Sequence, residues 1–170
     1  MQLTDIIDEV LDSENHVTVI GGSTGQGKTD TCCKITASMA DYGRNVWFVS
    51  DDPIDAISRK IGTSSPKVWI QQCNTMKAVE IDALLANGKH NELPNLLVLD
   101  SFNEFSDPDI QQEMMELARE YNMHILISLN LTKEIVPVSP KTQFIVDADN
   151  VDLVVAVTNE ASYVNYERVL

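Results

Sequence analysis

One segment constrains this chain more than any other, because it places a lysine and a threonine directly after closely spaced glycines. From Gly22 to Thr29 it matches the pattern G-x-x-x-x-G-K-[ST] without substitution, between the apolar run 16–21 and the helical pattern 28–42. Glycines let successive backbone N–H groups curve around an anion, and the helix that follows directs its positive end at the same point. The segment therefore predicts a phosphate-binding loop between a strand and a helix.

Two side chains of this loop have specific expected roles. Lys28 is spaced to reach the β- and γ-phosphates of a nucleotide, and the Thr29 hydroxyl is placed to ligate Mg²⁺. A glycine turn without any ligand is the alternative, but such a turn would not require both residues. We therefore expect ATP with Mg²⁺ as the bound group. The predicted nucleotide-binding residues are Gly22, Ser23, Thr24, Gly25, Gln26, Gly27, Lys28, Thr29 and Asp30.

Short apolar runs alternate with amphipathic patterns along the chain, which predicts an α/β fold: a mostly parallel central sheet with helices on both faces. The last two strands are expected to pair as a C-terminal β-hairpin that extends the sheet in antiparallel fashion. Residues 1–15 are expected to form an amphipathic helix ahead of a domain spanning 16–170, and 132–147 a surface loop. The remaining strands are expected at 16–21, 45–50, 67–71, 95–100 and 124–129, and the remaining helices at 28–42, 53–60, 75–87 and 108–121. Val79 is expected on the apolar side of the helix 75–87, and Trp69 in the core.

Length and charge narrow the functional classes. The 170 residues suit one compact domain, and 44% hydrophobic residues are enough to build a core. The net charge of −14, from 12 basic and 26 acidic residues, argues against a protein that grips DNA through a broad basic face. The polar, acidic start lacks the pattern of a signal peptide, and no apolar run is long enough to span a bilayer. Three cysteines without metal-ligand spacing fit a reducing cytoplasm.

Aspartates follow two of the predicted strands, and both positions are expected at the sheet edge that carries the loop. Asp100 ends a buried apolar run and is expected to support Mg²⁺; a solvated aspartate at a strand end is the alternative. Asp51 and Asp52 follow another strand, where a carboxylate can polarise a water molecule against the γ-phosphate. The same pair before Pro53 is also an ordinary helix start, and the two roles are compatible.

The order of these motifs resembles the ATPase core of the RecA, DnaB and KaiC group, and most closely the RecA-like P-loop ATPase domain of DnaB-type, phage-like replicative helicases. The resemblance covers residues 16–170, almost the whole chain. Five segments carry it: GGSTGQGKT, VWFVSDDP, LLVLDS, HILISLNLTKE and DADNVDLVVAV.

The resemblance implies roles for individual residues. It implies that Lys28 and Thr29 hold phosphate and Mg²⁺, that Asp100 supports the metal as the end of the Walker B strand, and that Asn130 senses the γ-phosphate. The place of the catalytic glutamate aligns best with Asp52.

The sequence departs from the family at several of these positions. Asp51 aligns less well than Asp52 with the catalytic glutamate, and Asp52 is one methylene shorter than that residue. Asn130 stands where many members have Gln or His, and Asp30 where many have Thr or Ser. Members of the family carry an Arg or Lys just after the strand that here begins near Val151, where it acts on the neighbouring subunit, and this sequence has none there. Arg168 takes that role only if it lies at a subunit boundary. Slow hydrolysis by the isolated chain is therefore expected.

The resemblance further implies a homo-oligomer, either ring or filament, acting in DNA replication or recombination in bacteria or infected cells. Its partner would be single-stranded DNA or a replication or recombination protein. The leading helix is expected either to contact a neighbouring subunit or to fold back on its own core. The competing function is a regulatory adaptor that uses the same fold to bind a helicase or recombinase. A small-molecule kinase is a weaker third candidate, because the sequence has no arginine cluster for a lid.

Overall fold

The computed structural model describes residues 1–62, 65–87, 93–130, 149–160 and 163–170. Helices and strands alternate as expected, and each predicted element is present with ends shifted by at most a few residues. The helices are α1 (Leu3–Leu11), α2 (Lys28–Asp41), α3 (Ile54–Ile61), α4 (Ala78–Asn87) and α5 (Pro108–Glu120), with a short 3-10 helix, η1 (Asn103–Ser106). The strands are β1 (Val17–Gly22), β2 (Val46–Ser50), β3 (Val68–Gln72), β4 (Leu96–Leu99), β5 (His124–Asn130), β6 (Leu153–Asn159) and β7 (Val164–Arg168).

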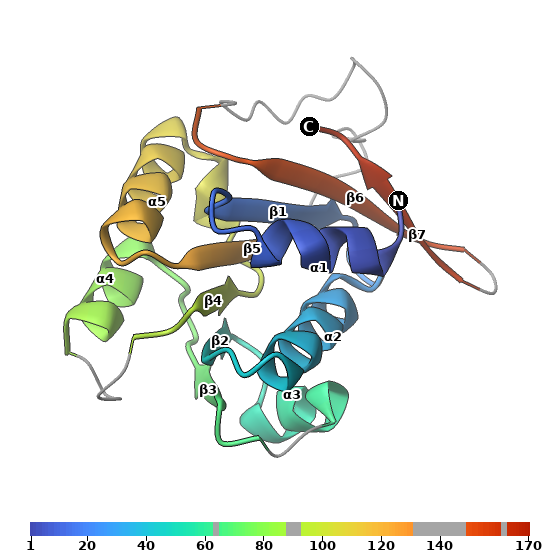
Figure 1. Cartoon of the computed structure of the whole chain (residues 1–170), viewed down its shortest axis with the longest axis horizontal. Coiled ribbons are helices and arrows are strands. Elements are labelled where there is room, and N and C mark those ends of the chain that lie inside the picture. Colours follow the sequence, from blue (N-terminus) through green and yellow to red (C-terminus); the bar gives the residue numbers. More distant parts are fainter. Residues whose placement is uncertain (63–64, 88–92, 131–148, 161–162) are drawn as a thin grey trace.

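The described strands form one seven-stranded sheet in the order β3-β2-β4-β5-β1-β6-β7 (Figure 1). The strands from β3 to β6 in this order are parallel, and β7 alone runs antiparallel, to β6. The C-terminal hairpin is therefore confirmed, although β6 itself is parallel to β1. Because parallel strands end at the same edge, the carboxyl ends of β2, β4, β5 and β1 meet along one side of the sheet.

Helices cover both faces of the sheet, as the alternating pattern predicted. On one face α1, α2 and α3 pack against strand side chains such as Ile20, Phe48 and Val98. On the other face α4, η1 and α5 pack against the alternate strand positions, such as Val19 and Leu97. Both clusters contain fully buried side chains, so neither face of the central strands meets water. This explains why these strands are continuous apolar runs in the sequence.

The strand β1 is anchored where it begins. One carboxylate oxygen of Asp152 accepts hydrogen bonds from the backbone N–H groups of His16 and Val17, at 2.6 and 2.9 Å. Asp152 directly precedes β6, which pairs with β1 in parallel. The acidic side chain therefore ties the starts of the two strands together and sets their register.

Two hydrophobic residues expected in the core lie elsewhere. Val79 was expected on the apolar face of α4 but is 79% exposed. The helix instead buries Ala78, Ile81 and Leu85, and a residue one step from Ala78 is rotated by about 100° away from that face. Trp69 is only half-buried because β3 is an edge strand; its ring packs edge-on against buried Trp47 with centroids 5.0 Å apart.

The leading helix packs on its own chain, which is the second of the two expected arrangements. Ile6, Ile7 and Val10 of α1 are buried in the same cluster as residues of α2 and β6. At the other end of the chain, Arg168 of β7 forms an ion pair with Glu9 of α1 at 3.0 Å. In the described residues no helix combines the length and hydrophobicity that crossing a bilayer requires. The expected loop 132–147 lies outside the described residues.

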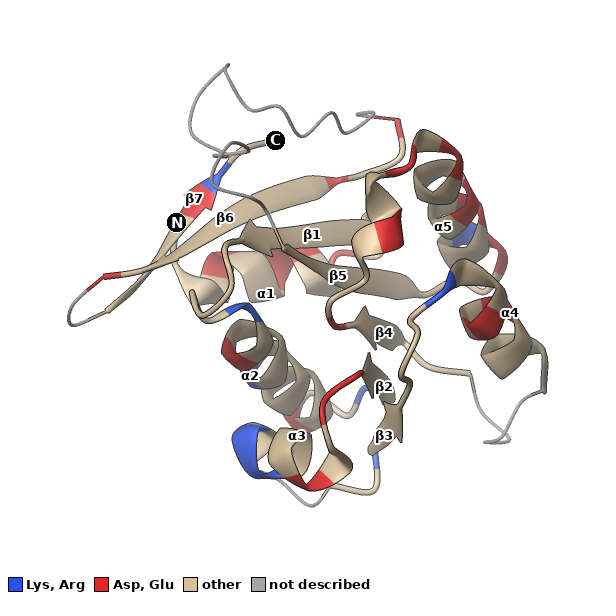
Figure 2. Cartoon of the chain, turned by 180° about the vertical axis from the view of Figure 1, so that it is seen from behind, with Lys and Arg blue, Asp and Glu red and all other residues tan. Residues whose placement is uncertain are grey.

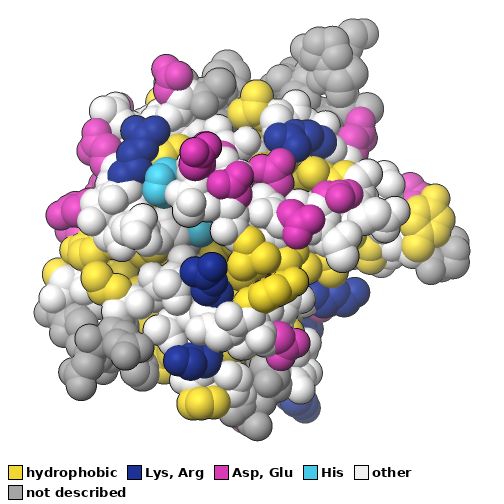
Figure 3. All heavy atoms as spheres, in the orientation of Figure 1, with side chains coloured by type: hydrophobic (Ala, Val, Ile, Leu, Met, Phe, Trp, Pro, Cys, Tyr) yellow, Lys and Arg dark blue, Asp and Glu magenta, His cyan; other side chains and the backbone are white. Residues whose placement is uncertain are grey.

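Acidic side chains dominate the surface, in keeping with the net charge of −14. Figure 2 shows acidic residues along α4 and α5, while basic residues are scattered in the described part of the chain. The opposite view shows several acidic side chains grouped on one part of the surface (Figure 3). Asp5 and Asp8 of α1 and Asp12, which directly follows this helix, share a surface hollow with Glu9 and Arg168.

Candidate nucleotide site

The glycine-rich loop joins the end of β1 to the start of α2. Gly25 and Gly27 have φ values of +81° and +93°, in the region that favours glycine. A Cβ atom on Gly22 would lie 2.7 Å from the backbone oxygen of Val157, so the loop passes too close to β6 for any side chain. Because α2 begins at Lys28, its first amide groups have no partner within the helix and are available to an anion.

The Lys28 side chain is buried and turns back over the loop. Its Nζ donates a hydrogen bond to the carbonyl oxygen of Ser23 at 2.8 Å. Burial lowers the pKa of the ammonium group, and the nearby carboxylate of Asp100 opposes that shift. The positive charge is therefore held inside the bend of the loop, where the sequence predicted the phosphates.

Thr29 and Asp100 come together, although their elements are not neighbours in the sheet. The Thr29 hydroxyl lies 3.1 and 3.2 Å from the two carboxylate oxygens of Asp100. Strand β5 separates β4 from β1. The contact forms because α2 starts above the carboxyl edge and because Asp100 directly follows the end of β4. The predicted metal-supporting pair is thus assembled.

Two buried serines that the sequence analysis did not select also contact Asp100. Ser50, at the end of β2, donates to one carboxylate oxygen at 2.9 Å, and Ser128 of β5 donates to the other at 2.7 Å. Both serines are fully buried. Burial raises the pKa of Asp100, and the hydrogen bonds from Ser128, Ser50 and Thr29 counteract that effect. A polar residue near the carboxyl end of an apolar strand is the signal that could have identified them.

The structure distinguishes the surroundings of the two aspartates after β2. Asp52 is half-buried, its backbone N–H donates to Ser50 Oγ at 3.1 Å, and its carboxylate is close enough to Asp100 to raise the pKa of that residue. Asp51 is exposed, and its carbonyl oxygen accepts a hydrogen bond from Gln72 at 3.3 Å. Asp52 is therefore the aspartate that lies at the site.

Asn130 ends β5 beside the loop. The parallel register pairs it with Gly22, the first residue of the loop motif. Its side chain is exposed, and its backbone N–H donates to the Asn103 side chain at 3.1 Å. The position is compatible with the predicted γ-phosphate sensor, which remains a prediction.

Other residues of the loop contact neighbouring elements. Asp30 is exposed and pairs with Lys60 of α3 at 3.2 Å. The Gln26 side chain accepts a hydrogen bond from the backbone N–H of Asn159 at 2.8 Å, which links the loop to the end of β6. Ser23 and Thr24 are exposed at the tip. Of the predicted nucleotide-binding residues, Gln26, Thr29 and Asp30 therefore have side-chain partners outside the loop.

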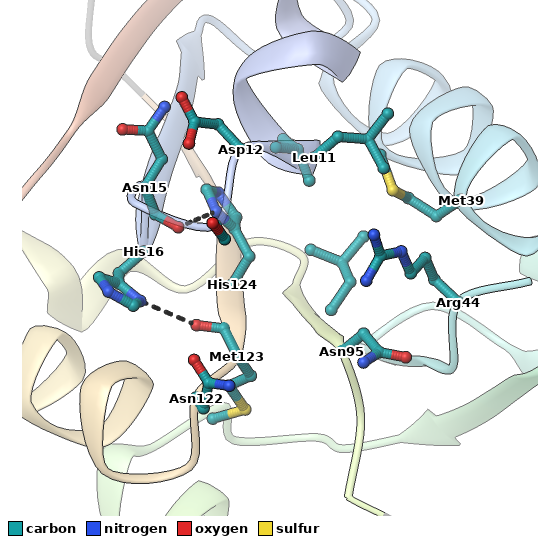
Figure 4. A pocket seen from close by; sticks show the side chains of 13 residues that line it. Leu11, Asp12, Asn15, His16, Met39, Arg44, Asn95, Asn122, Met123 and His124 are labelled. Atoms are coloured by element: carbon teal, nitrogen blue, oxygen red, sulfur yellow. Dashed lines mark hydrogen bonds between the residues drawn. The ribbon is translucent and has the colours of Figure 1, made fainter. Parts of the chain in front are cut away.

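A separate cavity lies at the opposite, amino-terminal edge of the sheet (Figure 4). It has a volume of about 150 Å³, below the usual range of about 300–1,000 Å³ for small-molecule sites. Buried His124 lines it, but its Nδ1 contacts the Asn15 carbonyl oxygen at 3.0 Å and its Nε2 the Thr18 hydroxyl at 2.9 Å. This cavity lies at the opposite end of the strands from the glycine loop, and both ring nitrogens of His124 already have partners.

The residues present fit a magnesium–nucleotide complex. Thr29 and Asp100 supply hard oxygen ligands, the type Mg²⁺ prefers. In the described residues no group of three or more His, Cys, Asp or Glu side chains could hold a metal alone. Phosphate oxygens and water would therefore have to complete the coordination, as is usual for Mg²⁺ at a nucleotide.

A glycine loop after the central strand, with a lysine and threonine facing an aspartate at the end of another parallel strand, defines a class of protein. The chain has a P-loop fold built on a RecA-type sheet.

Known proteins agree with this class. The structure of a KaiC-like protein from Pyrococcus horikoshii matches with a TM-score of 0.59 at 13% identity, over 90% of this chain and 76% of that one. The arsenical pump-driving ATPase of Escherichia coli is 30% identical over 74 residues, 44% of this chain and 13% of that protein. ATPase get3 of Botryotinia fuckeliana is 33% identical over 97 residues, 54% of this chain and 27% of that protein.

These comparisons support the fold and the nucleotide loop. The chain spans only 13% and 27% of the length of the two curated relatives. No protein-family model matches it. None of the three proteins is named as a DnaB-type helicase, so that finer resemblance stays a prediction.

Proposed function

We propose that this chain binds ATP with Mg²⁺ and hydrolyses it. The observation that carries the proposal is the contact of the Thr29 hydroxyl with both carboxylate oxygens of Asp100, directly beside the Lys28 ammonium group. A turn without a ligand has no need to gather a buried lysine, a threonine and a buried aspartate. The names of the two curated relatives, both ATPases, support the proposal.

In the proposed mechanism, water attacks the γ-phosphate in line with the leaving group. Asp52 accepts a proton from that water, and the Lys28 ammonium group neutralises charge that develops on the phosphate oxygens. Thr29 and Asp100 would hold the Mg²⁺, which supplies further charge neutralisation when bound. Asn130, the last residue of β5, would report on the γ-phosphate.

The first test is direct binding of MgATP, measured by calorimetry. We expect Lys28→Ala to weaken binding by at least about 100-fold, because a buried charge-assisted contact is lost. Lys34→Ala is the matched control: Lys34 is exposed on the same helix and should leave affinity unchanged. Equal affinity of wild type and Lys28→Ala would contradict the proposal.

For the cellular role, we propose an ATP-driven motor core of DNA replication or recombination that works as an oligomer. The RecA-type sheet supports this reading. The second candidate is a nucleotide-dependent adaptor that binds a helicase or recombinase. Two observations favour the adaptor. The net charge is −14, and Arg168, the candidate for a trans-acting arginine, is already paired with Glu9 of its own chain. The E. coli relative's name likewise describes an ATPase that drives a pump.

Measuring the hydrolysis rate with and without single-stranded DNA separates the two candidates. DNA should stimulate the hydrolysis rate of a motor. The motor should also form oligomers, either rings or filaments, whose mass light scattering detects. An adaptor should show a slow rate that DNA does not change. An arginine supplied by a partner is worth about 10³–10⁵ in rate where it has been measured, so stimulation by a partner protein would favour the adaptor.

A further inference from the structure

The carboxylate of Asp100 receives hydrogen bonds from three different elements. Thr29 approaches from α2, Ser50 from the end of β2 and Ser128 from β5. Strands β2 and β5 flank β4 on its two sides, so the two serines reach the carboxylate from opposite neighbours in the sheet. Rotation of the carboxylate about its side-chain bonds would break at least one of these contacts.

Each serine is itself oriented by a second hydrogen bond. Ser50 Oγ accepts from the backbone N–H of Asp52 at 3.1 Å, and Ser128 Oγ accepts from the backbone N–H of Ser101 at 2.7 Å. A hydroxyl has one proton, and accepting a bond from the backbone leaves that proton to be donated to Asp100. Ser101 adopts a φ of +64°, uncommon for a residue with a side chain, and this backbone geometry accompanies the contact with Ser128.

The network joins three parts of the candidate site. Ser50 connects Asp100 to the backbone of Asp52, the proposed base. Ser128 connects Asp100 to β5, the strand that ends in Asn130. Two fully buried hydroxyls that served packing alone would have no reason to converge on the same carboxylate.

We propose that Ser50 and Ser128 are positioning residues of the magnesium–nucleotide site: they hold the Asp100 carboxylate facing Thr29, and Ser50 also holds the backbone of Asp52. This inference rests on the proposed binding of MgATP. Partners that orient a metal-supporting carboxylate typically change metal affinity by about 10- to 100-fold when removed.

The test compares nucleotide affinity with and without metal in the same variant. A fluorescent ATP analogue is titrated into wild type, Ser50→Ala and Ser128→Ala, once with Mg²⁺ and once with EDTA. Both variants should keep the affinity measured in EDTA and lose about tenfold or more of the gain that Mg²⁺ provides. Thr36→Val is the control, because Thr36 is an equally buried hydroxyl that bonds only to the Cys32 carbonyl oxygen of its own helix.

The ratio of the two affinities separates positioning from general loss of structure. Variants that lose affinity equally with Mg²⁺ and with EDTA, or that keep the full metal gain, overturn the proposal. A wild-type protein that binds the analogue in neither condition overturns the proposed function as well. A wild-type protein that binds equally with and without metal overturns only the role of Asp100 and its two serines.

Single-turnover hydrolysis tests the additional link from Ser50 to Asp52. At saturating nucleotide and Mg²⁺, Ser50→Ala should be slower than Ser128→Ala, because only Ser50 bonds to the amide of Asp52. Equal rates in the two variants would overturn that link.

Discussion

At the residue scale, Asp51 and Asp52 follow the same strand but have different surroundings. Asp52 is half-buried beside the serine that contacts Asp100, whereas Asp51 is exposed. This difference supports the proposed role of Asp52 as the proton acceptor, which the resemblance to the family favoured only by position.

We expect Asp52→Asn to lower the hydrolysis rate by about 10²-fold or more, since a general base typically contributes about 10²–10⁴. Nucleotide affinity should change little, because the amide has nearly the same shape. Asp51→Asn is the matched control and should retain the wild-type rate. Phosphate release and nucleotide binding are to be measured for both variants. A slower rate in Asp51→Asn than in Asp52→Asn would contradict the assignment.

His124 is a second residue whose environment makes a prediction. A carbonyl oxygen can only accept, so Nδ1 carries the proton toward Asn15, and Nε2 accepts from the Thr18 hydroxyl. Burial lowers the pKa of the ring to about 4. The folded protein therefore holds this histidine in its neutral form.

This lowered pKa links stability to pH. The unfolded chain takes up the proton near pH 6.5 and the folded chain only near pH 4, so the stability present above pH 6.5 is lost as pH falls through this window. Between pH 6.5 and 5 this residue should lower the stability by about 1–2 kcal/mol. Urea unfolding at both pH values should show a smaller loss in His124→Asn than in wild type; an equal loss would contradict the prediction.

At the element scale, the β6–β7 hairpin braces the phosphate loop. Gly22 lies against the backbone of Val157, Gln26 bonds to Asn159, and the Tyr166 hydroxyl lies 3.0 Å from that of Thr31. The loop is therefore shaped by its own glycines and also by the last two strands of the chain.

Two alanine substitutions separate these influences. Gly22→Ala should push the loop away from β6, because its Cβ would meet the Val157 oxygen at 2.7 Å, and should cost about 1–3 kcal/mol of stability. Gly25→Ala meets no atom within 4 Å and should suffer only from its positive φ. Hydrogen exchange at the Asn159 amide should accelerate in Gly22→Ala but not in Gly25→Ala. Unchanged exchange in Gly22→Ala would show that the loop does not depend on this contact.

The sequence predicted much at this scale because its strongest signals are local. The place of the glycine loop between a strand and a helix, the strand–helix alternation and the terminal hairpin each depend on neighbouring residues, and all three are confirmed. Ser50 and Ser128 carry a weaker local signal, a polar residue near the carboxyl end of an apolar strand, and the strand order β2-β4-β5 is needed to show that they share a partner. Val79 was misplaced because three nearby apolar residues describe a helical face equally well without it.

At the scale of the whole molecule, α1 belongs to the folded core of its own chain. Ile6 is fully buried against the cluster that includes α2 and α3. This packing does not require a neighbouring subunit, so oligomerisation through α1 is not needed to cover its apolar face.

Ile6→Ala should therefore lower the free energy of unfolding by about 2–5 kcal/mol in the monomer. Val79→Ala, at a position 79% exposed, should change it by less than about 0.5 kcal/mol. Denaturant unfolding at several protein concentrations would measure both values. A loss for Ile6→Ala that appears only at concentrations where the wild type is oligomeric would instead indicate a contact between subunits.

The double anchoring of β1 has a mechanical consequence. The Asp152 carboxylate accepts hydrogen bonds from the backbone where the strand begins, and the strand pairs with β5 on one side and β6 on the other. A pull on the glycine loop along the strand axis would load both rows of backbone hydrogen bonds in shear, so they would resist together instead of peeling apart singly. Strand β1 is therefore a rigid element, and any movement of the loop on phosphate release would take place relative to it.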